Sequence, residues 1–286
     1  MDTQIKNSIL ATLVCDAYCL GTHWVYDEKE LAKLPIDWEN LNEAQSLWHK
    51  GKLAGEFTHY GDQALFLLEF VVKNKIFNQA DYYAFWSEKM SNYDGYIDGS
   101  TRESLKKKGA SSKDLSICGR IVPLLLCSNS KKQFLENVTA FVSITHNSSL
   151  ALNASAFFAE LLWDVKGGGN ISTLINHLKP KYEEFSIWID EAIAKKDENS
   201  FDIIREFGPA CGIDGGFAGV IYLLLQEKDF KSVMIENAKA GGDSSARGML
   251  VAMIMGMNKE IKIPTEWTQV MTKYKEMDGY LELSNP

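Results

Sequence analysis

An all-α fold is predicted for this chain of 286 residues. Three observations predict it. Apolar residues recur mostly at helical spacing, alternating β patterns are nearly absent, and several segments are small or apolar on all sides, which is typical of buried helices. Because only six prolines occur and no linker rich in Pro, Gly or Ser divides the chain, we expect a single domain over residues 1–286.

Two helices are expected in the N-terminal third. Ile5, Ile9 and Leu13 recur on one helix face. A second apolar run follows Asp62 and continues to Val72, and the Asp62 carboxylate is a suitable N-terminal cap for it.

Three further helices are expected in the rest of the chain. The Ala-rich segment from Ser148 to Asp164 predicts a buried helix, with Asn147 or Ser148 as its cap. Residues 216–227 form another apolar run, and residues 244–257 form a helix of small residues and methionines. These patterns imply a central helix that is covered by others.

Composition argues against several classes of partner. The 38 acidic and 30 basic residues give a net charge of −8, so we expect neither nucleic acid nor a membrane surface as a partner. The N-terminus lacks a signal-peptide pattern, and no apolar stretch is long enough to span a bilayer. We expect a cytoplasmic protein with reduced cysteines. These are Cys15, Cys19, Cys118, Cys127 and Cys211.

Polar clusters lie where the predicted helices begin or end. They cover residues 16–27, 57–63, 144–149 and 240–248. Asp16 lies within an apolar run and would need a partner if buried. Gly241 and Gly242 allow close approach of a ligand, and the helix start after them suits a phosphate or a hard divalent cation.

Each cluster also has a purely structural interpretation. Trp24 and Tyr26 could pin a loop, and Asp243 could simply cap a helix. His146 could be a core histidine, and Arg247 could pair with an acid. The aromatic and acidic segment 93–98 either borders the same site or forms a plain surface turn around a glycine.

In this order, the clusters resemble the ADP-ribosylglycohydrolase family, which includes the dinitrogenase reductase-activating glycohydrolases. Gly241-Gly242-Asp243 resembles the family's GGDTDT signature, and Thr145-His146-Asn147 resembles its THND-type motif. Asp16-Ala17 is similar to the GDALG start, and Tyr60-Gly61-Asp62-Gln63 stands where the family has its TDDT metal motif. The resemblance extends from about residue 6 to about residue 260.

The resemblance implies an orthogonal bundle of many helices with two magnesium ions in a central cleft. It implies a glycosidase that cleaves the bond at C1″ of an ADP-ribose unit, in an ADP-ribosylated protein or a related small molecule. It implies Asp62, Asp243 and His146 as catalytic residues, with Asp62 and Asp243 also as metal ligands that face each other. The implied substrate-binding residues are Asp16, His23, Trp24, Tyr26, His59, Tyr60, Gln63, Asn147, Gly241, Gly242, Ser244, Ser245 and Arg247.

The sequence departs from the family pattern at the metal motifs. Tyr60-Gly61-Asp62 retains at most one carboxylate of the first motif, and Ser245 replaces the second Asp of the last. We therefore expect one Mg²⁺ or none, because fewer carboxylates bind two dications poorly. The alternative is an inactive protein on the same fold, either an ADP-ribose binder or a structural protein like the related jellyfish lens crystallins. The sequence leaves the oligomeric state open.

Overall fold

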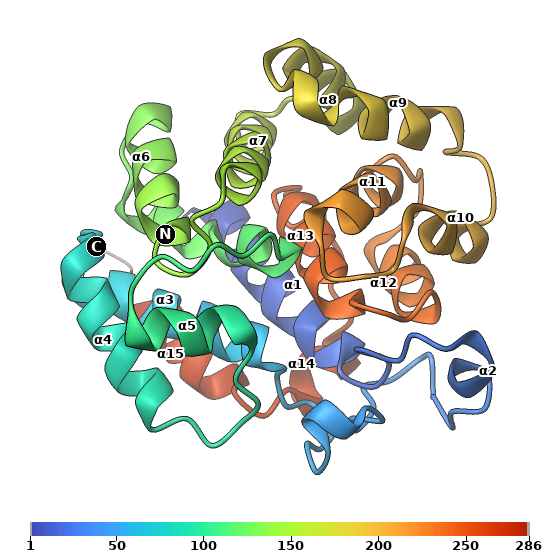
Figure 1. Cartoon of the computed structure of the whole chain (residues 1–286), viewed down its shortest axis with the longest axis horizontal. Coiled ribbons are helices and arrows are strands. Elements are labelled where there is room, and N and C mark those ends of the chain that lie inside the picture. The colour runs from blue at the N-terminus through green and yellow to red at the C-terminus, as the bar shows by residue number, and fades with distance from the viewer. Residues whose placement is uncertain (1, 285–286) are drawn as a thin grey trace.

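Helix α1 (Thr3–Cys19) runs through the centre of the molecule and lies against α13 (Ser244–Met255) (Figure 1). The computed structural model describes residues 2–284. Glycines allow the two helices to approach closely. A Cβ at Gly248 would lie 2.6 Å from the Cys15 sulfur, and one at Gly256 would lie 2.5 Å from Ser8 Cα. The expected central helix is therefore a tightly packed pair.

The described residues are almost entirely helical, which confirms the all-α prediction. Within residues 2–284 the β structure consists of two isolated bridges, Val25 with Gly242 and Asp114 with Gly212. The other helices, with 3₁₀ helices marked η, are α2 (Glu28–Leu31), η1 (Leu47–His49), α3 (His59–Asn74), α4 (Gln79–Ser91), α5 (Gly99–Lys106), η2 (Leu115–Arg120), η3 (Val122–Cys127), α6 (Lys131–Val142), α7 (Ser149–Lys166), α8 (Ile171–Leu178), η4 (Lys179–Lys181), η5 (Glu183–Phe185), α9 (Ser186–Ala194), α10 (Ser200–Phe207), α11 (Ile213–Leu224), α12 (Phe230–Lys239), α14 (Thr265–Val270) and α15 (Tyr274–Leu283).

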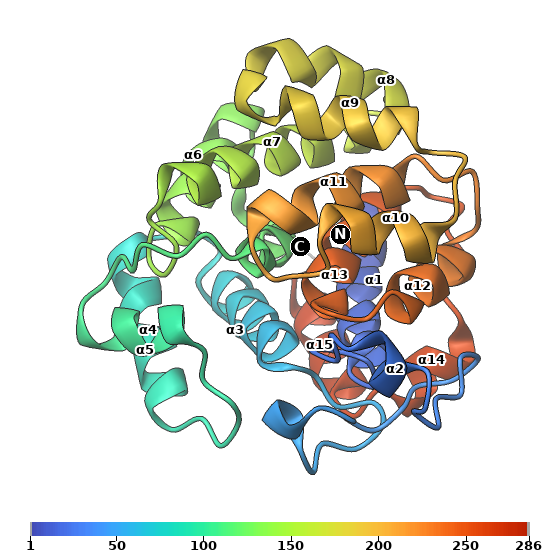
Figure 2. The same ribbon diagram turned by 45° about the vertical axis from the view of Figure 1, so that its right-hand side comes forward.

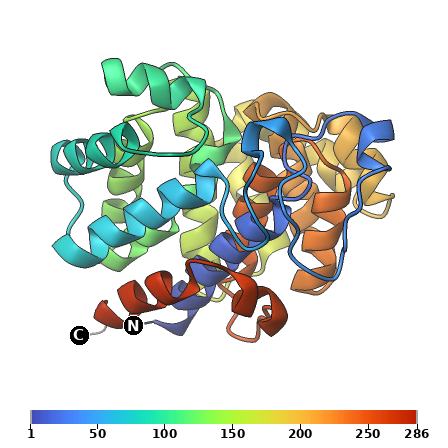
Figure 3. The ribbon, with the colours of Figure 1, turned by 90° about the horizontal axis from the view of Figure 1, so that it is seen from below.

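The remaining helices cover the central pair from several sides. Helices α8 and α9 lie over α7 and α11 at one end of the molecule (Figure 2). Helices α3 and α15 pack together on another side, and α15 lies beside the start of α1 (Figure 3). The Lys6 ammonium pairs with Asp278 at 3.1 Å there. The apolar side chains of these layers form one core cluster.

The helix caps test the sequence predictions directly. Ser148 caps α7 as expected, since its side chain accepts a hydrogen bond from the Ala151 amide. The prediction that Asp62 caps the second helix is wrong. Thr58 is the cap, and its hydroxyl accepts from the Tyr60 amide, so α3 begins before Asp62. Asp62 lies in the first turn of the helix, where its side chain points to other partners.

Two class predictions concern membranes and cysteines. Among residues 2–284, none of the helices combines the length and the hydropathy that a bilayer crossing requires. All five cysteines are free, and four of them are buried.

Candidate functional site

Two chain segments far apart in sequence are joined at the start of α13. The Trp24 amide donates to the Gly242 carbonyl at 2.7 Å, and the Gly242 amide donates to the Val25 carbonyl at 2.8 Å. Gly241 and Gly242 both have positive φ, and a Cβ on Gly242 would lie 2.1 Å from the Pro209 carbonyl oxygen. The two glycines are thus required by neighbouring backbone, whereas the sequence suggested a ligand.

Asp243 follows this double glycine and is completely buried. Its Oδ1 accepts from the Ala246 amide and caps α13, and its Oδ2 accepts from the Tyr60 hydroxyl at 3.1 Å. Burial raises the pKa of the Asp243 carboxyl group, although the Ala246 amide and the nearby Arg247 charge oppose this. The structure therefore holds a carboxyl group of raised proton affinity at the N-terminus of a central helix.

A second carboxylate, Asp114, lies beside Asp243. One oxygen of each carboxylate and the sulfur of Cys211 lie within 4.8 Å of one another. Burial, and then the charge of Asp243, raise the pKa of Asp114 to about 7. We call Asp114 and Asp243 the acid pair, because two carboxyl groups this close tend to share one proton near neutral pH.

Backbone pairing positions Asp114 and Cys211. The Leu115 amide donates to the Cys211 carbonyl at 2.8 Å, and the Ile213 amide donates to the Lys113 carbonyl at 3.0 Å. Asp114 also caps η2, because its Oδ1 accepts from the Ser116 amide at 2.9 Å. The chain before η2 and the chain before α11 therefore meet at the acid pair.

Asp16 is buried, and the donors around it satisfy its oxygens. It accepts from the Thr58 amide at 2.7 Å, from the Thr58 hydroxyl at 2.6 Å and from the Ser245 hydroxyl. Burial raises its pKa to about 6, and these hydrogen bonds limit the rise. Asp16 ties α1 to the starts of α3 and α13.

Asp62 has a different set of partners from Asp243. Its oxygens accept from Lys273 Nζ at 2.6 Å, from Lys52 Nζ at 3.1 Å and from the Tyr93 hydroxyl at 2.6 Å. No hydrogen-bond partner within residues 2–284 is common to Asp62 and Asp243. Asp62 and Asp243 are therefore held by different sets of partners, and their expected pairing across one site stays a prediction.

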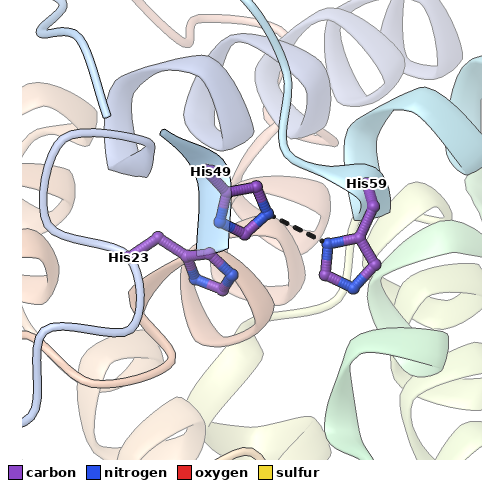
Figure 4. Close-up of side chains that lie close together, drawn as sticks. All are labelled: His23, His49 and His59. Atoms are coloured by element: carbon purple, nitrogen blue, oxygen red, sulfur yellow. Dashed lines mark hydrogen bonds between the residues drawn. The ribbon is translucent and has the colours of Figure 1, made fainter. Parts of the chain in front are cut away.

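Three buried histidines lie next to the acid pair. His23, His49 and His59 each place one ring nitrogen within 4.8 Å of the others, and we call them the histidine cluster (Figure 4). His49 Nε2 and His59 Nδ1 are hydrogen-bonded at 3.2 Å. His23 Nδ1 lies 3.3 Å from Asp243 Oδ1.

Aromatic side chains pack around the histidine cluster. The rings of Trp24, Trp48 and Tyr96 make edge contacts with one another, with centroids 5.1 to 6.2 Å apart. Trp48 is 59% exposed and Tyr26 is 41% exposed, so aromatic surface is open to solvent near the site. Because Tyr96 takes part, the segment 93–98 borders the site and is more than a plain turn.

The remaining predicted residues have other environments. The Arg247 guanidinium is buried and donates to the carbonyl oxygens of Gly241 and Asn237, and its Nη1 has no hydrogen-bond partner within residues 2–284. Gln63 is buried and accepts from the Trp86 indole. His146 is buried, and its Nδ1 pairs with the Thr145 hydroxyl at 2.8 Å.

Two predicted residues remain, one exposed and one buried. Asn147 is exposed and forms no hydrogen bond with the acid pair within the described chain. Ser244 is buried, and its hydroxyl lies 3.3 Å from that of Thr22.

Comparison with known proteins shows the family and the fold to which this chain belongs. The family profile described as ADP-ribosylglycohydrolase matches residues 2–284. The chain belongs to the ADP-ribosylglycohydrolase family. A solved structure titled "ADP-ribosylglycohydrolase-related protein complex" superposes with a TM-score of 0.73 at 18% identity, covering 99% of this chain and 96% of that one, which supports the fold.

Two curated relatives of this family member are crystallins by name. Crystallin J1A of Tripedalia cystophora is 25% identical, with 98% of this chain and 95% of the crystallin covered. Crystallin J1B of the same animal is 24% identical, with 97% and 94% covered.

Sequence reasoning missed several site residues of this family member. Asp114, Cys211 and His49 lie outside the four clusters that the sequence suggested, and Lys273 comes from the C-terminal segment. A signal was available for Cys211, since it lies in a glycine-rich stretch directly before an apolar helix.

The acid pair predicts a pH-dependent stability. The pKa of Asp114 lies near 7 in the folded state, against the ordinary 3.8. A carboxyl group with a raised folded pKa stabilises the fold as it takes up its proton, so this stability is lost as the pH rises through about 7. Asp114→Asn should lack this stabilisation at acid pH. When urea unfolding is measured at about pH 5.5 and about pH 8.5, the free energy of unfolding of the wild type, relative to that of the variant, should be roughly 2 kcal/mol higher at the lower pH.

The fold should tolerate this change, because Asn is also a good helix cap. Asp229→Asn is the matched control: Asp229 is an exposed cap of α12 whose pKa is lowered, so its loss should give no such gain at acid pH. Parallel pH profiles for wild type and Asp114→Asn would contradict the acid pair.

Proposed function

We propose that this protein hydrolyses the glycosidic bond at C1″ of an ADP-ribose unit, in an ADP-ribosylated protein or a related ADP-ribose compound. The observation that carries the proposal is the acid pair. Two carboxyl groups of raised pKa, next to a glycine turn in a member of this family, provide an acid and a base near neutral pH.

The chemistry assigns one role to each carboxyl group. Asp114, with a pKa of about 7, can donate its proton to the leaving group as the C1″ bond breaks. Asp243 accepts a hydrogen bond from Tyr60, which favours its charged form, and at this short separation from Asp114 its carboxylate can attack C1″ and form an ester with the sugar. Water then attacks C1″ and displaces the Asp243 carboxylate while Asp114 takes up a proton from the water, so protons and atoms balance over the reaction.

We also propose that this reaction does not use a pair of magnesium ions. The ammonium groups of Lys52 and Lys273 already neutralise the Asp62 carboxylate, and the Tyr93 hydroxyl donates a hydrogen bond to it. A Cβ at Gly61 would lie 2.2 Å from Asp16 Oδ2, so a carboxylate has no room where the family motif would supply one. The donor set therefore does not fit two dications, and at most one ion could bind between the two carboxylates of the acid pair.

Substrate recognition is proposed to use the surroundings of the acid pair. Tyr26 is partly exposed and lies near the acid pair. Burial raises the pKa of Tyr26, and the charges of Asp243, Cys211 and Asp114 raise it further. An exposed ring of this kind can stack on adenine. Gly212, the N-cap residue of α11, provides no side chain to cap the helix, and the N-terminus of a helix stabilises a phosphate.

Binding of ADP-ribose tests the proposal before any substrate is known. In thermal unfolding without Mg²⁺, ADP-ribose should raise the Tm of the wild type, because a ligand bound only to the folded state stabilises it, by about 2.7 kcal/mol at a hundred times Kd. Tyr26→Ala should reduce the shift, and Tyr280→Ala, at the partly buried end of α15, should leave it unchanged. If ADP-ribose leaves the Tm unchanged both with and without Mg²⁺, the proposal is contradicted. If ADP-ribose raises the Tm only with Mg²⁺, the result indicates that one ion binds at the acid pair.

The second candidate is a protein of this fold without turnover. Two observations support it: the two crystallin relatives, and the ion pairs that Asp62 forms with Lys52 and Lys273. It predicts no hydrolysis of ADP-ribosyl substrates under any metal condition. A rise in Tm with ADP-ribose but no turnover would favour a binding role. The absence of both the rise in Tm and turnover would favour a structural role.

A further inference from the structure

We propose that the histidine cluster binds one divalent transition-metal ion, with Zn²⁺ as the best fit. The cluster is distinct from the carboxylates expected to hold magnesium, and the proposal does not rest on hydrolysis of ADP-ribose. His23, His49 and His59 come from the loop after α1, from η1 and from the start of α3. All three are buried, and one nitrogen from each lies within 4.8 Å of the other two (Figure 4).

The first argument is that most of the ring nitrogens have no hydrogen-bond partner. Both nitrogens of His23, Nδ1 of His49 and Nε2 of His59 are buried and have no hydrogen-bond partner within residues 2–284. Buried polar atoms are normally satisfied, and each exception calls for an explanation. A metal ion at the centre of the cluster would supply the missing interaction of His23 Nε2, whereas His23 Nδ1 and His59 Nε2 face the carboxylates of Asp243 and Asp98.

The second argument is the spacing of the ring nitrogens. His49 Nε2 and His59 Nδ1 are 3.2 Å apart. Two nitrogens bound tetrahedrally to Zn²⁺, each at the usual distance, are about 3.3 Å apart.

The third argument is a carboxylate behind two of the three rings. Asp98 Oδ2 lies 3.6 Å from His59 Nε2, and Asp243 Oδ1 lies 3.3 Å from His23 Nδ1. Metal-binding histidines usually have such a partner at the nitrogen that faces away from the ion. This arrangement leaves Nδ1 of His59 and Nε2 of His23 for the ion.

The donor set also selects the ion. Three imidazoles suit zinc, copper or nickel, whereas Mg²⁺ requires oxygen ligands. Three protein ligands leave a fourth position, as in catalytic rather than structural zinc sites. Trp24 and Tyr96 lie over the cluster, with ring centroids 5.3 and 5.2 Å from that of His59, so that position is sheltered from bulk water.

Metal titration of the full chain tests the proposal. After chelator treatment, isothermal titration with ZnCl₂ should show one site, Co²⁺ should give the visible absorption of a tetrahedral complex, and MgCl₂ should not compete. His49→Gln should weaken Zn²⁺ binding by on the order of 100-fold or more, and Asp98→Asn by on the order of 10-fold. His177→Gln, at an exposed histidine on α8, and His146→Gln, at a buried one outside the cluster, should bind Zn²⁺ like the wild type.

Circular dichroism of each variant separates loss of binding from loss of fold, and Asp98→Asn keeps all three ligands. The proposal would be overturned by the absence of a stoichiometric Zn²⁺ site in folded wild type. It would equally be overturned by a site that folded His49→Gln retains or that His177→Gln loses. Because the readout is metal binding alone, failure of the hydrolase proposal leaves this result unaffected.

Discussion

Replacing Asp243 by Asn should lower kcat for hydrolysis of an ADP-ribosyl substrate by at least about 10³-fold. The Asn amide cannot attack C1″ as a carboxylate can, and it leaves Asp114 without its charged neighbour. The fold should survive, because Asp243 caps α13 through the Ala246 amide and Asn is an equally good cap. Initial rates with ADP-ribosylated arginine and serine peptides, together with circular dichroism, measure this expectation.

The control for that variant is Asp229→Asn on α12, which exchanges another helix-capping aspartate and should keep wild-type rates. A shift of the pH–rate profile provides a second check. Asp114→Asn should remove the limb that reports a group with a pKa of about 7. An Asp243→Asn variant that retains more than a tenth of the wild-type rate would exclude Asp243 from the chemistry.

Replacing Arg247 by Met should destabilise the protein by about 3 kcal/mol or more. The Arg247 guanidinium is fully buried and donates to Asn237 Oδ1 at 3.1 Å, to the Asn237 carbonyl at 3.3 Å and to the Gly241 carbonyl at 2.8 Å. Met removes every one of these donors and leaves buried oxygens unpaired. Urea unfolding at neutral pH measures the loss.

Arg205→Met is the matched comparison for this second variant. Arg205 also donates to two carbonyl oxygens, of Ala240 at 3.0 Å and of Tyr26 at 2.8 Å, but it is only partly buried. Water can replace its hydrogen bonds, so we expect a loss of about 1 kcal/mol. Equal losses for both variants would show that burial of Arg247 is not what makes it important.

The parts of this protein that the sequence predicted are those with a periodic or local signal. The α7 helix and its Ser148 cap follow from an Ala-rich pattern over one segment. The position of Asp243 at the start of α13 follows from a glycine turn before small residues. Such signals lie within a few turns of chain, so a single sequence contains them.

The parts that could not be predicted depend on contacts between distant segments. Lys273 pairs with Asp62 across 211 residues, and nothing near either residue indicates the other. Asp114 meets Asp243 only because the loops before η2 and α11 pair through Leu115 and Cys211. His49 lies in a short 3₁₀ turn without a periodic pattern. The ion pairs of Asp62 with Lys52 and Lys273 are therefore evident only in the folded chain.

The central claim is that the acid pair, without a magnesium pair, hydrolyses the C1″ bond. Its most direct test compares hydrolysis of ADP-ribosyl peptides by the wild type in Mg²⁺-free solution and in millimolar MgCl₂, with Asp243→Asn as the inactive reference. We expect release of ADP-ribose at rates that agree within about twofold under the two conditions, because the reacting groups are carboxyl groups of the chain and the donors do not fit two dications. An absence of turnover under both conditions, or turnover that begins only with Mg²⁺ and requires two bound ions per chain, would contradict the claim.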